Sequence, residues 1–77
     1  MAQVYFHCSN SARTLIDRRG TAVGDLLEAR DHAAQVVRSL IMAPSTEDWR
    51  SWVLHASDAS GDEIFVVPFA SVLGKPH

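Results

Sequence analysis

The sequence predicts a single small α+β domain with the element order ββαββ, built as a four-stranded antiparallel sheet with one amphipathic helix on one face. Two pairs of segments rich in β-branched and aromatic residues flank one long helical segment, and turn-forming residues separate the members of each pair. The chain has 77 residues, of which 47% are hydrophobic and 21% are charged. This composition is typical of one globular domain that spans residues 1–77.

The first predicted strand covers residues 4–8, which read Val-Tyr-Phe-His-Cys and so combine β-branched and aromatic side chains. Residues 9–11 read Ser-Asn-Ser, which is typical of a turn. A second, shorter strand is predicted over residues 13–17. It leads into a turn that begins at Asp17 and that Gly20 closes. These two strands are expected to form an antiparallel hairpin.

The middle of the chain predicts one helix over residues 26–42. Asp25 can serve as the N-cap, and Glu28 follows three positions later, in the manner of a capping box. Pro44 helps to end the helix because the residue before a proline avoids the helical conformation. One half of the helical wheel is apolar, which suits a helix that lies across a sheet. That half consists of Leu26, Leu27, Ala29, Ala33, Ala34, Val36, Val37, Leu40 and Ile41.

The C-terminal hairpin begins with a predicted strand over residues 51–57. A turn over residues 58–62 follows, in which Gly61 supplies a positive φ. The final strand is predicted over residues 63–69, and residues 70–73 form a short turn of helix.

Two tryptophans stand near the start of this hairpin. Trp52 is predicted to lie in the core because it belongs to the apolar set of its strand. Trp49 lies at the junction between loop and strand. It either caps the end of the helix or is exposed, and an exposed tryptophan often anchors an interface.

The predicted strand order in the sheet is 2-1-3-4. This order puts the weak second strand and the strand containing Pro68 at the edges, where a proline is tolerated. Side chains alternate between the two faces of a strand, which divides the first and third strands into two sets. The more apolar set, predicted to face the helix, is Val4, Phe6, Cys8, Trp52, Leu54 and Ala56. The opposite set is Tyr5, His7, Val53 and His55.

The face opposite the helix is the predicted interaction surface. In the final strand both alternating sets are apolar, so either Phe65 with Val67 or Ile64 with Val66 can extend this face. One helix covers only one face of a sheet, and an exposed apolar strip usually marks an interface. A homodimer or a complex with another protein is therefore predicted, through this face or through an edge strand. The candidate interface residues are Tyr5, His7, Val53, His55, Phe65 and Val67.

Arg30 is the one charged residue in the apolar half of the helix. In one interpretation its aliphatic stem packs in the core and its guanidinium reaches solvent past the edge of the sheet. In the other, Arg30 is at least half-buried and pairs with Asp17, Asp58 or a ligand anion.

Charge and cysteine content restrict the partners. The net charge of −2 makes nucleic acid an unlikely ligand, and no apolar run approaches the roughly 20 residues that span a membrane. The N-terminus lacks the pattern of a signal peptide. The one cysteine, Cys8, forms no intramolecular disulfide and is predicted to be a small core residue. These observations favour a cytoplasmic location.

No motif assigns a chemical reaction. The sequence lacks a glycine-rich phosphate loop, a nucleophile elbow and a metal-binding cysteine or histidine motif. His7 and His55 share a face if their strands are neighbours, but two ligands do not make a zinc site. We therefore predict no catalytic residue, no metal, no cofactor and no small-molecule substrate.

Several short motifs occur in a recognisable order. They are Tyr5-Phe6-His7, Asp17-x-x-Gly20, an alanine-rich helix that starts at Leu26, a strand led by Trp52, Asp58-x-x-Gly61 and Val67-Pro68-Phe69. Over nearly its whole length the chain resembles a family of short alphaproteobacterial proteins of unknown function, common in rhizobial genomes. The resemblance implies a stand-alone cytoplasmic domain and supplies no activity, substrate or catalytic residue.

The sequence leaves three classes of function open. The preferred one is a non-enzymatic protein-interaction or regulatory module that self-associates. The alternative is a domain that binds nucleic acid or a small anion through positive charge. An enzyme would need a pocket with convergent polar groups near His7, His55 or Arg30. The residues proposed for anion binding are Arg13, Arg18, Arg19 and Arg30.

Overall fold

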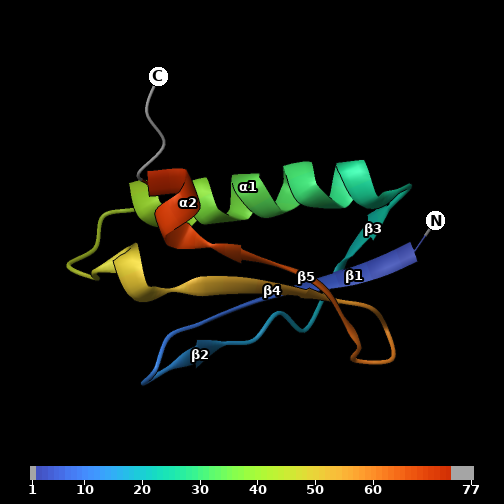
Figure 1. Ribbon diagram of the computed structural model, residues 1–77, viewed down its shortest axis with the longest axis horizontal. Coiled ribbons are helices and arrows are strands. Elements are labelled where there is room, and N and C mark those ends of the chain that lie inside the picture. The colour runs from blue at the N-terminus through green and yellow to red at the C-terminus, as the bar shows by residue number, and fades with distance from the viewer. Residues whose placement is uncertain (1, 74–77) are drawn as a thin grey trace.

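The computed structural model describes residues 2–73 and confirms the α+β class and the order of the predicted elements. One short strand is additional, so the antiparallel sheet has five strands instead of four. Figure 1 shows both α-helices on the same side of the sheet, with α2 beside the C-terminal end of α1. The elements are β1 (Ala2–Ser9), β2 (Thr14–Leu15), β3 (Thr21–Val23), α1 (Leu26–Met42), the 3-10 helix η1 (Trp49–Ser51), β4 (Val53–Ser57), β5 (Glu63–Pro68) and α2 (Phe69–Leu73).

The strand order is β2-β1-β4-β5, which is the predicted order 2-1-3-4. The additional strand β3 pairs with the start of β1, whereas β2 pairs with its end. The predicted second strand over 13–17 is therefore reduced to two paired residues. The reason is that the carboxylate of Asp17 accepts a hydrogen bond from the backbone N–H of Phe6, at 3.1 Å, in place of a backbone carbonyl.

Helix α1 has the predicted bounds because its first turn is capped. The Oδ1 atom of Asp25 accepts a hydrogen bond from the N–H of Glu28 at 2.8 Å. The Glu28 carboxylate reaches back to the N–H of Gly24, also at 2.8 Å, instead of the N–H of the cap residue itself. After Met42 the backbone turns extended at Ala43, as expected for a residue that precedes a proline.

The contact between α1 and the sheet is narrower than the apolar half of the helix. Ala29, Ala33 and Val37, spaced four residues apart, are the buried residues of α1. By contrast, Leu26 is 52% exposed and Leu27 is 69% exposed, although both residues were expected to face the sheet. Small side chains at the contact allow the helix to approach the sheet closely. The whole buried core is Val4, Phe6, Cys8, Val23, Ala29, Ala33, Val37, Trp52, Leu54, Ala56 and Phe69.

The predicted faces of β1 and β4 are confirmed, because every residue assigned to the helix side is buried. The prediction that Phe65 and Val67 lie on the face opposite the helix is wrong. Val67 pairs with Leu54 and Phe65 pairs with Ala56, so both pack against the core on the helix side. A register shift beside Ala56 makes Ile64 the extra residue of a β-bulge.

Trp52 is 1% exposed, as predicted. The ring of Trp49 lies 5.0 Å from the ring of Trp52 and 5.6 Å from that of Phe69, measured between centroids. Trp49 is thus half-buried and closes the end of the core where η1 meets α2. Trp49 is therefore not fully exposed, and its ring contacts are with Trp52 and Phe69 instead of with the end of α1.

Gly20 and Gly61 both adopt positive φ, at 71° and 90°, but their surroundings differ. A Cβ atom at Gly20 would lie 2.9 Å from Cε2 of Tyr5, whereas one at Gly61 meets nothing within 4 Å. We expect Gly61→Ala to cost about 1 kcal/mol of folding free energy, from backbone strain alone. Gly20→Ala should cost about 2–3 kcal/mol, because a steric clash adds to the strain. Urea denaturation of both variants measures the difference, and equal losses would contradict a clash at Gly20.

Candidate interaction groove and the histidine face

The face without helices carries four of the six candidate interface residues. Tyr5, His7, Val53 and His55 are all half-buried there, and His7 pairs directly with His55 across the strands. The turn after Asp17 already covers part of this face. The Nε2 group of Gln3 donates to the carbonyl of Arg19 at 2.8 Å, and Gly20 packs against the ring of Tyr5.

With Phe65 and Val67 facing the core, little apolar surface is left on the face without helices. Val66 is exposed there, opposite His55, and Val53 is half-buried. The expected broad apolar strip is therefore a mixed surface of aromatic, imidazole, hydroxyl and aliphatic groups. This composition can be solvated, so it does not by itself require a partner.

A hydrogen-bonded relay joins three strands on this face. Oγ of Ser9 lies 3.2 Å from Nε2 of His55, and Nδ1 of His55 lies 2.7 Å from Oε1 of Glu63. An ionised carboxylate only accepts hydrogen bonds, so Nδ1 carries the proton and Nε2 of a neutral ring accepts from the Ser9 hydroxyl. The connectivity is that of a serine–histidine–carboxylate triad.

The relay lies outside the three cavities described for residues 2–73, which are all lined by α1. None of the three includes Ser9, His55 or Glu63. Acyl transfer needs, besides such a relay, hydrogen-bond donors aimed at the developing oxyanion in a site that excludes water. The hydrogen bonds of the relay link β1, β4 and β5 across this face.

We expect no serine-dependent hydrolysis from this relay. With p-nitrophenyl acetate as substrate, the rate of hydrolysis by the intact protein should not exceed the rate given by free imidazole at the same concentration of histidine side chains. Ser9→Ala should leave the rate unchanged, because the hydroxyl lies outside the three described cavities and no bound ester would be held against it. A burst of p-nitrophenol equal to the protein concentration, lost in Ser9→Ala, would establish a catalytic serine instead.

The ring of His7 is held in a tautomer that disfavours metal binding. The backbone N–H of Asp17 donates to Nδ1 of His7 at 3.0 Å. Nε2 of the neutral ring therefore carries the hydrogen, and neither nitrogen is free to act as a ligand. Within residues 2–73, moreover, no three histidine, cysteine or acidic side chains are grouped as metal ligands would be.

Two of the four arginines proposed for anion binding lie against different aromatic rings. Arg13 pairs with Glu47, and its guanidinium lies 5.7 Å from the centroid of the Trp52 ring. The guanidinium of Arg30 is exposed and lies 5.0 Å from the centroid of the Phe65 ring, which is the arrangement expected of a snorkelling arginine. No ion pair of Arg30 with a carboxylate occurs among the described residues.

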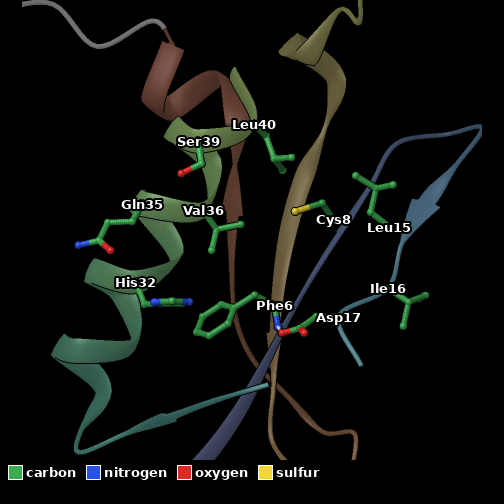
Figure 2. A pocket seen from close by; sticks show the side chains of 10 residues that line it. All are labelled: Phe6, Cys8, Leu15, Ile16, Asp17, His32, Gln35, Val36, Ser39 and Leu40. Carbon is green, nitrogen blue, oxygen red and sulfur yellow. Dashed lines mark hydrogen bonds between the residues drawn. The ribbon is translucent and has the colours of Figure 1, made fainter. Parts of the chain in front are cut away.

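The largest described cavity is an open groove between α1 and β2, with a volume of about 390 Å³. Figure 2 shows Leu15 and Ile16 on one side of the groove and the side chains of α1 on the other, with Phe6 and Cys8 between them. Leu15 is 44% exposed and Ile16 is 58% exposed. The α1 side is formed by His32, Gln35, Val36, Ser39 and Leu40, and Asp17 completes the lining.

Two ionisable groups that line the groove, Cys8 and Asp17, have shifted pKa values. Burial, reinforced by the negative charge of Asp17, raises the pKa of the Cys8 thiol to about 11, so the thiol stays protonated at neutral pH. Partial burial of Asp17 disfavours the charged carboxylate and therefore tends to raise its pKa. Its backbone hydrogen bonds from Phe6, Gly20 and Arg19 nevertheless hold the pKa of this carboxyl below its usual value. Cys8 is thus a core residue, as predicted, with a thiol that is protonated at neutral pH.

A second, polar hollow of about 300 Å³ adjoins the groove. His32 and Gln35 line both cavities. Nε2 of His32 lies 3.3 Å from Oγ1 of Thr21, which lines the polar hollow. Glu28 and Asp31 make the α1 wall of the hollow acidic. The groove therefore changes from apolar to acidic along α1.

The fold and the groove define a two-layer α+β domain whose main concavity is apolar and lies between its helix and one end of its sheet. The chain belongs to the family described as Domain of unknown function (DUF6894), whose model matches residues 3–70. Neither a curated protein nor a solved structure matches the chain. The family match says nothing of a source organism, so the rhizobial part of the resemblance stays a prediction. Among the described residues no helix has the length and apolar character needed to span a bilayer.

Proposed function

We propose that the chain is a non-enzymatic protein-interaction module whose groove between α1 and β2 binds apolar side chains of a partner. The observation that carries this proposal is the pair Leu15 and Ile16, which remain 44% and 58% exposed beside a groove floored by Phe6 and Cys8. Adjacent exposed apolar side chains around a concave apolar floor are typical of interaction sites.

The same proposal covers the regulatory role and the cellular location. A module without a reaction of its own acts by bringing its partner into, or out of, a complex. Its single cysteine, Cys8, is a buried free thiol, which agrees with a reducing compartment such as the cytoplasm.

Photo-cross-linking tests the proposal without knowledge of the partner. The photoreactive residue p-benzoylphenylalanine is placed at Ile16, on the groove, and in a separate variant at Leu27. Leu27 is a matched control because it is 69% exposed and lines none of the three cavities. After irradiation in the native cells, Ile16→p-benzoylphenylalanine should give a discrete protein adduct and the Leu27 variant should not. No adduct at either position, or equal adducts at both, would contradict a binding groove.

A further inference from the structure

We propose that the partner in the groove is a second copy of this chain, bound about a two-fold axis that runs along the groove. This inference rests on the proposed function, and it adds the identity and the geometry of the partner.

The two sides of the groove are complementary in shape. On the β2 side Leu15 and Ile16 project and are exposed, whereas on the α1 side Val36 and Leu40 are half-buried and leave room above Phe6. A two-fold axis along the groove places the β2 side of each copy against the α1 side of the other. Each groove would then receive the Leu-Ile pair of its partner, so the interface is isologous and closed.

The residues that continue the two sides of the groove carry opposite charges. Arg18 and Arg19 are exposed and follow directly after Asp17, which lines the groove. Glu28 and Asp31 are exposed on the α1 side of the adjoining hollow. The backbone of this turn covers the helix-free face, but the turn leads directly into Thr21, which lines the hollow. The same two-fold axis that pairs the apolar sides therefore brings this edge of one copy toward the acidic wall of the other, within reach of two long arginine side chains. None of these four residues forms an ion pair within residues 2–73 of a single copy.

The chain itself contains the segment that the groove would select. An apolar groove with an acidic continuation selects apolar side chains followed by basic ones. The sequence Leu15-Ile16-Asp17-Arg18-Arg19 has this order and lies at the surface. A second copy therefore presents a suitable ligand at no cost in folding a flexible peptide.

The interface would be small, so the dimer should be weak. A groove of about 390 Å³ accommodates only a few side chains, and interfaces that bury less than about 1,200 Å² in total are usually transient. Sedimentation equilibrium should be measured from about 10 µM to about 1 mM, a range in which weak association is detected. The apparent mass is expected to rise from 8.5 kDa toward twice this value.

Two sets of variants test the geometry. Ile16→Asp should weaken association at least about tenfold, since it removes an apolar contact and buries a charge. Leu27→Asp is the matched control and should associate like the original chain. Asp31→Arg alone and Arg18→Asp with Arg19→Asp should each weaken association, and an equimolar mixture of the two proteins should recover part of it as a heterodimer.

The outcomes separate the inference from the proposed function. A chain that stays monomeric up to about 1 mM overturns the second copy as partner. If photo-adducts at Ile16 still form with another protein, the interaction groove survives. If Ile16→Asp and the charge reversals leave the dissociation constant of the dimer unchanged, the dimer interface does not lie at the groove. Because Ile16 is 58% exposed, Ile16→Asp should keep the urea midpoint of the original chain, which shows that a loss of association is not unfolding.

Discussion

Trp52→Ala should lower the free energy of unfolding by about 3–5 kcal/mol, which is most of the stability that a domain of this size has. The indole is 1% exposed, and its ring centroid lies 5.0 Å from that of Trp49 and 6.3 Å from that of Phe69. Its Nε1 donates to Oε2 of Glu47 at 3.2 Å. The alanine variant would leave a cavity between β4, η1 and α2 and would remove the donor to Glu47.

Urea denaturation followed by far-ultraviolet circular dichroism measures this loss. Trp52→Phe retains an aromatic ring and should cost only about 1–2 kcal/mol, which keeps the prediction measurable if the alanine variant does not fold. Trp49→Ala is the control and should cost less than Trp52→Ala, because Trp49 is half-buried. A loss below about 1 kcal/mol for Trp52→Ala would show that the site collapses and refills the cavity.

The features that could be predicted from the sequence depend on local geometry. The two faces of β1 and β4 follow from alternation, which any extended strand obeys. The bounds of α1 follow from Asp25, whose side chain caps the first turn, and from Pro44, which the helix cannot continue through. The αL turns at Gly20 and Gly61 likewise follow from residue type.

The features that could not be predicted depend on tertiary placement. In β5 both alternating sets are apolar, so only the pairing of Phe65 with Ala56 and the bulge at Ile64 decide which set faces the core. Strand β3 has three residues, too few for a periodic signal. The groove exists because α1 contacts the sheet through a narrow stripe at one side, a property of packing that no single segment encodes.

The candidate site shows the same division. Leu15 and Ile16 are consecutive apolar residues in the weak second strand that the sequence predicts. Successive side chains of a strand point to opposite faces of the sheet, so a helix on one face cannot cover both of them. That signal was available in the sequence. The relay of Ser9, His55 and Glu63 was not, because it joins residues 46 positions apart through the register of β1 with β4.

Asp17→Ala should lower the free energy of unfolding by about 2–4 kcal/mol, although the side chain is only half-buried. Its carboxylate accepts hydrogen bonds from the N–H groups of Phe6, Arg19 and Gly20, each at 3.1 Å. The bond from Phe6 replaces strand pairing that β1 lacks between β2 and β3, and the other two bonds hold the turn. Without the carboxylate, the N–H of Phe6 loses its partner and the turn at Gly20 loses its anchor. Asp17→Asn keeps one acceptor oxygen and should lose about half as much.

The contribution of Asp17 should also depend on pH in a defined direction. The pKa of its carboxyl is lower in the folded chain than the usual value of about 3.9, so the folded state binds the proton less tightly than the unfolded state does. The stabilisation is therefore fully present above about pH 5 and is lost as the pH falls through the folded pKa. Hydrogen bonds with Arg50 lower the pKa of Asp48 to about 2. Asp48 titrates in the same way in the original chain and in Asp17→Asn, so its effect cancels when the unfolding free energies of the two proteins are subtracted. That difference, measured by urea denaturation between about pH 6 and pH 2.5, should shrink toward low pH. A constant difference would mean that Asp17 stabilises the turn by shape alone and not through its charge.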